Sequence, residues 1–413
     1  MSSTAPIDAD RLWQSHMEMA EIGATPAGGV GRLALTDLDK QSRDLFVRWC
    51  RDGGYAIRVD TMGNIFARRP GTESDRPPVM TGSHLDTQPL GGKFDGAYGV
   101  LAGLEVLRAL DDAGVKTRAP TDVVVWSDEE GVRFAGGVVG SGVFAGRFDL
   151  DYGLNMLDRD GTTTFGRELA RIAYDGNEPC GGYPIAAFFE AHIEQGPILE
   201  NEGAVIGAVL GAQGQKCFSV TVTGDEGHAG TLPMALRKDA MVGTARMMDA
   251  LNRMAFEYDP TPVLTTGYVR VWPNSRNTIQ GLVNFSVDCR HPDDEILEAV
   301  CGRIDGVCRQ IADGMGLGLI VDETSARRAT HFDGACVQAV RDASDALGLT
   351  WRDIHSGAGH DACNLARCTP TGMIFVPCAG GISHNERETA TREDLADGCR
   401  VLLEVIVEHS GRA

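Results

Sequence analysis

The chain has 413 residues, of which 43% are hydrophobic and 23% charged, the composition of an ordinary globular protein long enough for two domains. Its formal net charge of −20 argues against nucleic acid and against an anionic membrane as partners, because both require basic patches. The eleven cysteines have irregular spacing without a C-x-x-C pair, and no apolar run approaches the ~20 residues that cross a bilayer, so we expect reduced thiols and a cytoplasmic location.

The first part of the chain alternates between helical and strand-like patterns. We expect helices at 9–22, 37–53 and 99–110, and strands at 55–59, 64–68 and 78–82. Three later strands are nearly unbroken apolar runs, at 122–127, 186–192 and 372–377. Such runs are typical of strands buried on both faces of a sheet with helical crossovers. The sequence therefore predicts an α/β domain with a mainly parallel sheet.

The middle third has a different rhythm. The order is strand, helix, strand, strand, helix, strand, at 217–223, 237–254, 263–271, 283–289, 293–314 and 317–321. This is the split β-α-β pattern of a small independent α+β domain. We expect it to occupy residues 214–328, inserted between two parts of the larger domain, 1–213 and 329–413.

Four of the expected strands lead into side chains that can bind a metal. The strand at 78–82 leads to His84, with Asp86 and Asp95 beyond it, and the other three lead to Glu129 and Glu130, to His192 and to His384. Because ligands bind beyond the carboxyl ends of strands in open α/β sheets, we expect these side chains to share one site.

The candidate ligands divide into two sets by chemistry. Imidazole and carboxylate together suit a borderline-hard divalent metal such as Zn, Mn, Co or Ni, and ligand type does not choose among these. Two such ions about 3.5–4 Å apart need one bridging carboxylate, and Asp95 is the natural bridge. We expect His84 and His192 to complete one ion, and Glu130 and His384 to complete the other.

Two acidic residues remain beside this ligand set. Glu129 is adjacent to the ligand Glu130 but is not itself one of the five ligands, which suits a general base for the attacking water. Asp86 lies two residues beyond His84 and could accept the second N–H of its imidazole, which would fix the tautomer; the alternative is a plain loop cap. The glycine-rich run GGVVGSG at 136–142 lacks the G-x-G-x-x-G spacing of a nucleotide-binding loop.

These residues lie in specific motifs along nearly the whole chain. The motifs are GSHLDTQPLGGKFDG (82–96), DEEGVRF (128–134), EAHIEQGPILE (190–200), HAGTLPMALRKDA (228–240), NSRNTIQG (274–281), DCRHP (288–292), SGAGHDA (356–362) and FVPCAGGISHNERE (375–388). With them the chain closely resembles the M20 metallopeptidase-like amidohydrolases, in the hydantoinase/carbamoylase branch. A histidine at the position of His192, where the peptidase branches have an acid, points to that branch.

The resemblance implies the same five ligands and the same base in a metallohydrolase catalytic domain. It also implies that the inserted domain acts as a lid, carries the contact of a homodimer, and supplies His228, Asn277 and Arg290 to the substrate, from the same or the partner subunit. Gln195 is implied to lie beside the metal. Arg290 would pair with a substrate carboxylate in bidentate fashion and His228 would hold a developing oxyanion; the alternatives are a strand-end surface arginine and a turn histidine.

We therefore expect a dinuclear-metal enzyme that hydrolyses the ureido C–N bond of a small substrate bearing a carboxylate. N-carbamoyl-L-amino acids or N-carbamoyl-β-alanine would yield the amino acid, ammonia and carbon dioxide. An allantoate amidohydrolase or another M20-type amidase is the alternative enzyme. The non-enzymatic alternative is a metal-dependent binding protein that retains the fold. The presence of all five ligand residues and of the base argues against this alternative.

Overall fold

The computed structural model describes residues 5–134 and 136–413, which form two compact units. Unit 2, Ala212–Thr330, is inserted into unit 1, which comprises the chain up to Gly211 together with His331–Ala413. The limits expected for the small domain, 214 and 328, fall two residues inside those of unit 2. No helix among the described residues is long and apolar enough to cross a membrane.

Unit 1 is built on a nine-stranded sheet of order β1-β2-β4-β3-β5-β16-β6-β14, with β15 paired to β6. Its strands are β1 (Ala56–Val59), β2 (Ile65–Arg69), β3 (Val79–His84), β4 (Thr121–Trp126), β5 (Ala187–Ile193), β6 (Ile206–Ala212), β14 (Thr330–His331), β15 (Trp351–Ser356) and β16 (Thr371–Val376). The four central strands β4, β3, β5 and β16 are parallel, while β2 and β6 pair antiparallel to them. The carboxyl ends of the central strands therefore lie at one edge, and the predicted fold class is confirmed.

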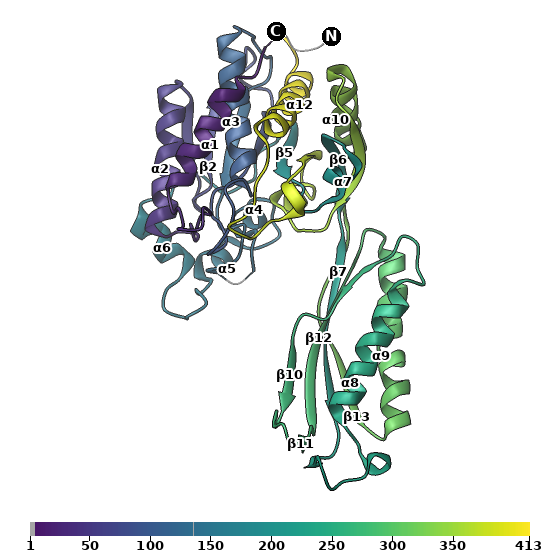
Figure 1. Ribbon diagram of the computed structural model, residues 1–413. Coiled ribbons are helices and arrows are strands. Elements are labelled where there is room, and N and C mark those ends of the chain that lie inside the picture. The colour runs from purple at the N-terminus through teal and green to yellow at the C-terminus, as the bar shows by residue number, and fades with distance from the viewer. Residues whose placement is uncertain (1–4, 135) are drawn as a thin grey trace. The chain divides into compact units, whose positions relative to one another are not determined.

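Helices cover both faces of this sheet (Figure 1). They are α1 (Ala9–Glu21), α2 (Asp37–Asp52), α3 (Ala97–Asp112), α4 (Val139–Phe144), α5 (Leu150–Asn155), α6 (Phe165–Ile172), α7 (Ile198–Glu202), α10 (Gly334–Leu347), α11 (Asp361–Leu365) and α12 (Arg392–Ser410). Along β4, Val123 and Val125 join the apolar core under α3 and α12, whereas Val124 and Trp126 join a second core on the opposite face. This two-sided burial explains the unbroken apolar run.

Unit 2 is an α+β domain with a sheet of its own. Its five-stranded antiparallel sheet has the order β10-β12-β7-β13 with β9 paired to β12, and α8 and α9 pack on it (Figure 1). The elements are β7 (Gly214–Thr223), β8 (Gly227–His228), α8 (Ala240–Ala255), β9 (Val263–Thr265), β10 (Val269–Trp272), β11 (Thr278–Ile279), β12 (Leu282–His291), α9 (Asp294–Met315) and β13 (Gly318–Arg327). β8 and β11 form a separate two-stranded ladder.

Several boundaries in unit 2 differ from expectation, and two of these differences have a local cause. The strand expected at 263–271 is divided into β9 and β10, because the Ser286 hydroxyl accepts hydrogen bonds from the N–H groups of Gly267 and Tyr268 and interrupts the ladder. Helix α8 begins at Ala240 instead of 237. Asp239 is its N-cap, because the Asp239 side chain accepts hydrogen bonds from the backbone N–H groups of Met241 and Val242.

Candidate metal centre

The carboxyl ends of the four parallel strands bring the five predicted ligands together. Two groups of three donors form, in each of which the donor atoms lie within 4.8 Å of one another. One group is His84, Asp95 and His192, and the other is Asp95, Glu130 and His384. Asp95 is the member that both groups share.

The two carboxylate oxygens of Asp95 face different groups. Asp95 Oδ1 lies 3.2 Å from His192 Nε2 and 3.7 Å from His84 Nε2. Asp95 Oδ2 lies 3.5 Å from His384 Nε2. The next residue, Gly96, has a φ of +66°, and a Cβ built there would lie 2.3 Å from the His84 ring. Glycine is therefore required for the chain to turn from the carboxylate into α3.

The backbone fixes the orientation of the two buried histidines. His84 Nδ1 lies 2.9 Å from the main-chain oxygen of Asp86, and His192 Nδ1 lies 2.9 Å from that of Ile193. A carbonyl oxygen only accepts, so each Nδ1 carries the proton. Because Nδ1 is held by a main-chain oxygen, Nε2 is the nitrogen of each ring that faces Asp95 and that a metal would bind.

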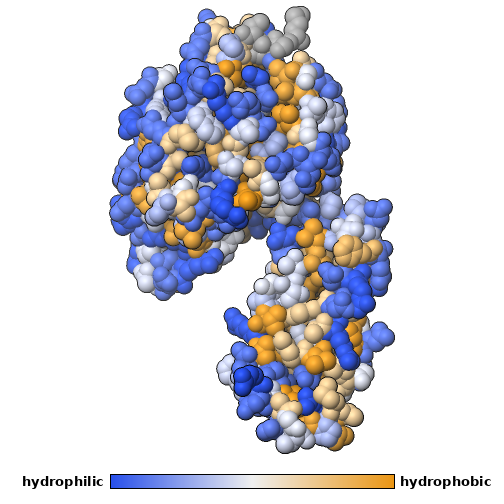
Figure 2. Space-filling view, in the orientation of Figure 1, coloured by the Kyte–Doolittle hydropathy of each residue, from blue (hydrophilic) through white to orange (hydrophobic). Residues whose placement is uncertain are grey.

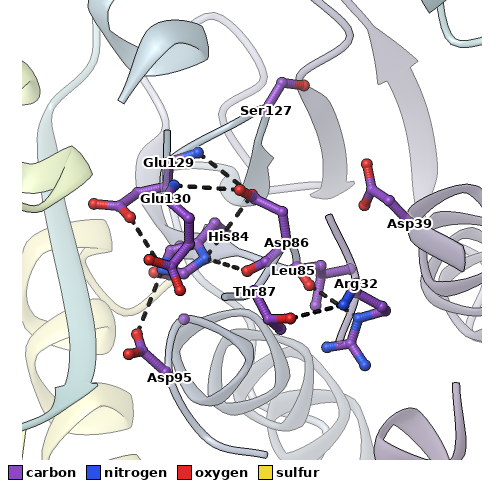
Figure 3. A network of polar contacts seen from close by, with 12 residues as sticks. Arg32, Asp39, His84, Leu85, Asp86, Thr87, Asp95, Ser127, Glu129 and Glu130 are labelled. Carbon is purple, nitrogen blue, oxygen red and sulfur yellow. Dashed lines mark hydrogen bonds and ion pairs between the residues drawn. The ribbon is translucent and has the colours of Figure 1, made fainter. Parts of the chain in front are cut away.

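Asp86 acts differently from the sequence expectation. Its carboxylate Oδ1 is 3.9 Å from His84 Nδ1, so the main-chain oxygen and not the side chain holds the imidazole. The Asp86 carboxylate instead accepts from the backbone N–H groups of Glu129 and Glu130, at 3.4 and 3.2 Å (Figure 3). Asp86 thus joins the β3 segment to the acidic segment that follows β4.

The electrostatics of the centre favour a cation. Burial opposes ionisation of Asp95, but the hydrogen bond from His192 and the histidine charges hold its pKa well below the usual range. Burial lowers the pKa of His192, yet Asp95 and Glu190 outweigh it and raise the value to about 9. Burial and neighbouring carboxylates raise the pKa of both Glu129 and Glu130 far above the usual value. Acceptors packed this closely are stabilised by a proton or a metal ion between them, so the residues fit divalent cations.

Glu129 stands apart from both groups of donors. Its Oε2 lies 3.6 Å from His84 Nε2, and its side chain is 12% exposed, so it borders the centre with access to solvent. The neighbouring Glu130 is held by Gln88, which donates from its backbone N–H and its side-chain amide at 3.2 and 2.7 Å. The adjacent carboxylates therefore differ in environment, as the division into a base and a ligand requires.

Other polar residues around the centre were not assigned from the sequence. Besides Gln88, they include Ser383, whose hydroxyl lies 2.8 Å from Asp95 Oδ2. Glu190, His192 and His360 form a third buried group of possible donors, with the His192 and His360 rings 4.7 Å apart. His360 lies in the SGAGHDA motif, between β15 and the short helix α11, and no strand was predicted ahead of it from the sequence. Gln195, which was expected near the metal, donates to Asp95 Oδ2 at 2.8 Å.

Unit 2 holds its three expected substrate residues at two separate ends. His228 and Asn277 are neighbours across the β8–β11 ladder, where the Ala229 N–H donates to the Asn277 carbonyl oxygen. His228 Nδ1 accepts from the Gly230 N–H at 3.0 Å, so the exposed Nε2 carries the proton of the neutral ring. This is the tautomer that an oxyanion donor needs.

Arg290 lies at the other end of unit 2. It is eight positions along β12 from Leu282, the end nearest the β8–β11 ladder, and eight positions of strand span about 26 Å. Its Nε and one terminal nitrogen pair with the Asp288 carboxylate at 2.9 and 3.1 Å. The bidentate face that was expected for a substrate carboxylate is therefore engaged by Asp288.

Residues 80–408 match the family model described as peptidase family M20/M25/M40. The chain belongs to this family. The chain is 45% identical to an N-carbamoyl-L-amino-acid amidohydrolase of Rhizobium meliloti, over 97% of this chain and 96% of that one. It is 34% identical to the allantoate amidohydrolase of Escherichia coli, over 93% and 94% of the two chains.

A solved hydantoinase/carbamoylase family amidase from Burkholderia multivorans superposes on this M20 chain with a TM-score of 0.96, at 53% identity and 99% coverage of both chains. The resemblance drawn from the motifs is thereby confirmed, and so is the prediction of a hydrolase that acts on amide or ureido C–N bonds.

Proposed function

We propose that the chain is a dinuclear-metal amidohydrolase that cleaves the ureido C–N bond of N-carbamoyl-L-amino acids. The observation that carries the proposal is the two-sided Asp95 carboxylate, with His84 and His192 on one side and Glu130 and His384 on the other. One carboxylate between two donor sets is what a pair of divalent ions requires. The choice of substrate rests on the 45% identity to an N-carbamoyl-L-amino-acid amidohydrolase over nearly the full length.

His84, His192 and Asp95 would hold one ion, and Glu130, His384 and Asp95 the other, with Zn, Mn, Co or Ni all compatible with these donors. Divalent ions bound there would lower the pKa of water and polarise the ureido carbonyl. Glu129 takes a proton from the attacking water and returns it to the leaving amine. The C–N bond breaks, the amino acid leaves, and the remaining carbamate decomposes to ammonia and carbon dioxide.

We infer that unit 2 supplies substrate contacts and joins two copies of the chain. His228 offers an N–H to the developing oxyanion and Asn277 lies beside it. Arg290 would exchange its ion pair with Asp288 for one with the substrate carboxylate. About 26 Å of strand separates the two ends of β12, so one small substrate cannot touch His228 and Arg290 of the same chain. Both residues can serve one site only if two subunits contribute to it.

The surface of unit 2 supports the homodimer. Eleven of the seventeen large apolar side chains found exposed in the described residues belong to unit 2, which is less than a third of the chain. Apolar side chains are visible among polar ones over this unit in Figure 2. Trp272 is 68% exposed, Phe256 72% and Met234 75%. Exposed apolar surface of this kind is typical of an interface between chains. Since all eleven cysteines are free, we also assign the enzyme to the reducing cytoplasm.

Allantoate is the second candidate substrate, because allantoate amidohydrolases of Escherichia coli and Bacillus subtilis are 34% and 33% identical to the chain. The test is kcat/KM of metal-reconstituted protein on N-carbamoyl-L-methionine, N-carbamoyl-β-alanine and allantoate, with Mn²⁺, Co²⁺ or Zn²⁺ added. We expect the carbamoyl-L-amino acid to be preferred. A preference for allantoate would overturn the substrate assignment, and no turnover of any of the three with any metal would overturn the proposed activity.

A further inference from the structure

A buried carboxylate outside both donor groups connects the two loops that carry Asp95 and His384. Glu388 lies four residues after His384 and is 4% exposed. Its Oε1 accepts from the backbone N–H groups of Phe94 and Asp95, at 2.9 and 3.1 Å. Its Oε2 lies 3.1 Å from the hydroxyl of Ser383, the same hydroxyl that contacts Asp95 Oδ2. Glu388 therefore accepts from the backbone of Asp95 directly, and the Ser383 hydroxyl lies between the two carboxylates, with its one proton to donate to either of them.

The chain makes room for this carboxylate at Gly92. A Cβ built at Gly92 would lie 2.0 Å from both Glu388 Cδ and Glu388 Oε1. The backbone of Gly92 is not in the left-handed region, so its conformation alone does not require glycine. Glycine is required at this position because any side chain would collide with Glu388. Gly92 and Glu388 thus form one packing unit, on which the loop that leads to Asp95 rests.

We propose that Glu388 is a positioning residue that holds Asp95 so that its second oxygen faces His384 and Glu130. The inference rests on the proposed dinuclear centre and adds to it a residue that touches neither ion nor substrate. His84 and His192 are fixed independently, by main-chain oxygens of their own segments. His384 is half exposed, with 51% of its side chain open, so its ring is held less firmly than the two buried histidines. Loss of Glu388 should therefore lower the affinity for the ion held by Asp95, Glu130 and His384 before it affects the other ion.

The test is the binding of Co²⁺ to metal-stripped protein, followed by calorimetry and by the visible absorption of each bound ion. The wild type should bind two ions. Glu388→Ala should keep the first and bind the second about 10–100-fold more weakly, the usual cost of losing a partner behind a ligand. Glu388→Gln should bind both ions nearly as the wild type does, because the amide oxygen still accepts the two backbone N–H groups. Gly92→Ala, which displaces the carboxylate without removing it, should reproduce the loss.

Asp60→Ala is the matched control. Asp60 is also a buried carboxylate of unit 1, and it accepts from two backbone N–H groups, those of Met62 and Asn64, at 2.9 and 3.0 Å. It lies in the β1–β2 turn, which carries none of the proposed ligands, so both ions should be retained. Binding of two ions by Glu388→Ala with wild-type affinity would overturn the role of Glu388, as would equal losses in the Gln and Ala variants. A wild type that binds fewer than two ions would instead overturn the dinuclear centre, and the role of Glu388 with it.

Discussion

Replacing Glu129 by glutamine should separate metal binding from turnover. Glu129 borders the centre, with its Oε2 3.6 Å from His84 Nε2, but it belongs to neither group of three donors. The amide of glutamine has nearly the same shape as the carboxylate but cannot accept a proton from water. The variant should therefore bind both ions and fail at the proton transfer.

The expected loss follows from the role of a general base. A positioned base contributes about 10²–10⁴ in rate, which corresponds to about 3–5 kcal/mol of activation free energy. The loss should fall on kcat with little change in KM, since Glu129 is not assigned to the binding of substrate. The assay is ammonia release from N-carbamoyl-L-methionine under saturating metal, together with the metal content of the purified variant.

Glu130→Gln is the matched control for this experiment. The two residues are neighbours with the same side chain, but Glu130 belongs to the donor group of Asp95 and His384. Glu130→Gln should lose affinity for the second ion, and part of its activity should return at high metal concentration. The assignment of the base would be refuted if Glu129→Gln kept more than about a tenth of the wild-type kcat, because a loss that small is below the range for a general base.

Three further outcomes are expected elsewhere in the molecule. Mixing Arg290→Ala with His228→Ala should restore roughly one quarter of wild-type activity, because half of randomly formed dimers are mixed and each mixed dimer has one intact site; no recovery would mean that both residues act within one chain. Asp86→Asn should lower kcat about 10–100-fold, because an amide NH₂ would meet the N–H of Glu129 or Glu130, and unchanged kinetics would remove Asp86 from support of the centre. His16 lies on α1 and is fully buried, and burial lowers its pKa from 6.5 to about 3, so between pH 7 and pH 5 only the unfolded chain takes up its proton. The wild type should therefore lose about 2 kcal/mol more unfolding free energy over this range than His16→Phe, and equal losses in urea titrations would contradict this.

The strand ends could be predicted because each strand carries two independent signals. The run from Asp122 to Trp126 is apolar on both faces, which marks a strand between helical layers, and the acids that follow it have no place in such a layer. The parallel order of the central strands then brings the strand ends to one edge, so the shared position of His84 and His192 follows from topology alone.

The supporting contacts could not be predicted in the same way. Glu388 reaches Asp95 from 293 residues along the chain, and its role depends on the space left by a glycine that looks like an ordinary loop residue. The contact of Asp86 with His84 was predicted for the wrong atom. The main-chain oxygen of Asp86, and not its carboxylate, holds the imidazole, and the sequence does not distinguish two acceptors that belong to the same residue. The pairing of Arg290 with Asp288 was likewise hidden, because residues two apart on a strand share a face whether or not they bond.

In the proposed centre one carboxylate, that of Asp95, lies between two cations. Anomalous diffraction from crystals of the protein grown with Mn²⁺ measures this most directly. We expect two peaks about 3.5–4 Å apart, one beside His84 and His192 and the other beside Glu130 and His384, with the Asp95 carboxylate between them. A single peak, or two peaks of which one does not contact Asp95, would contradict it.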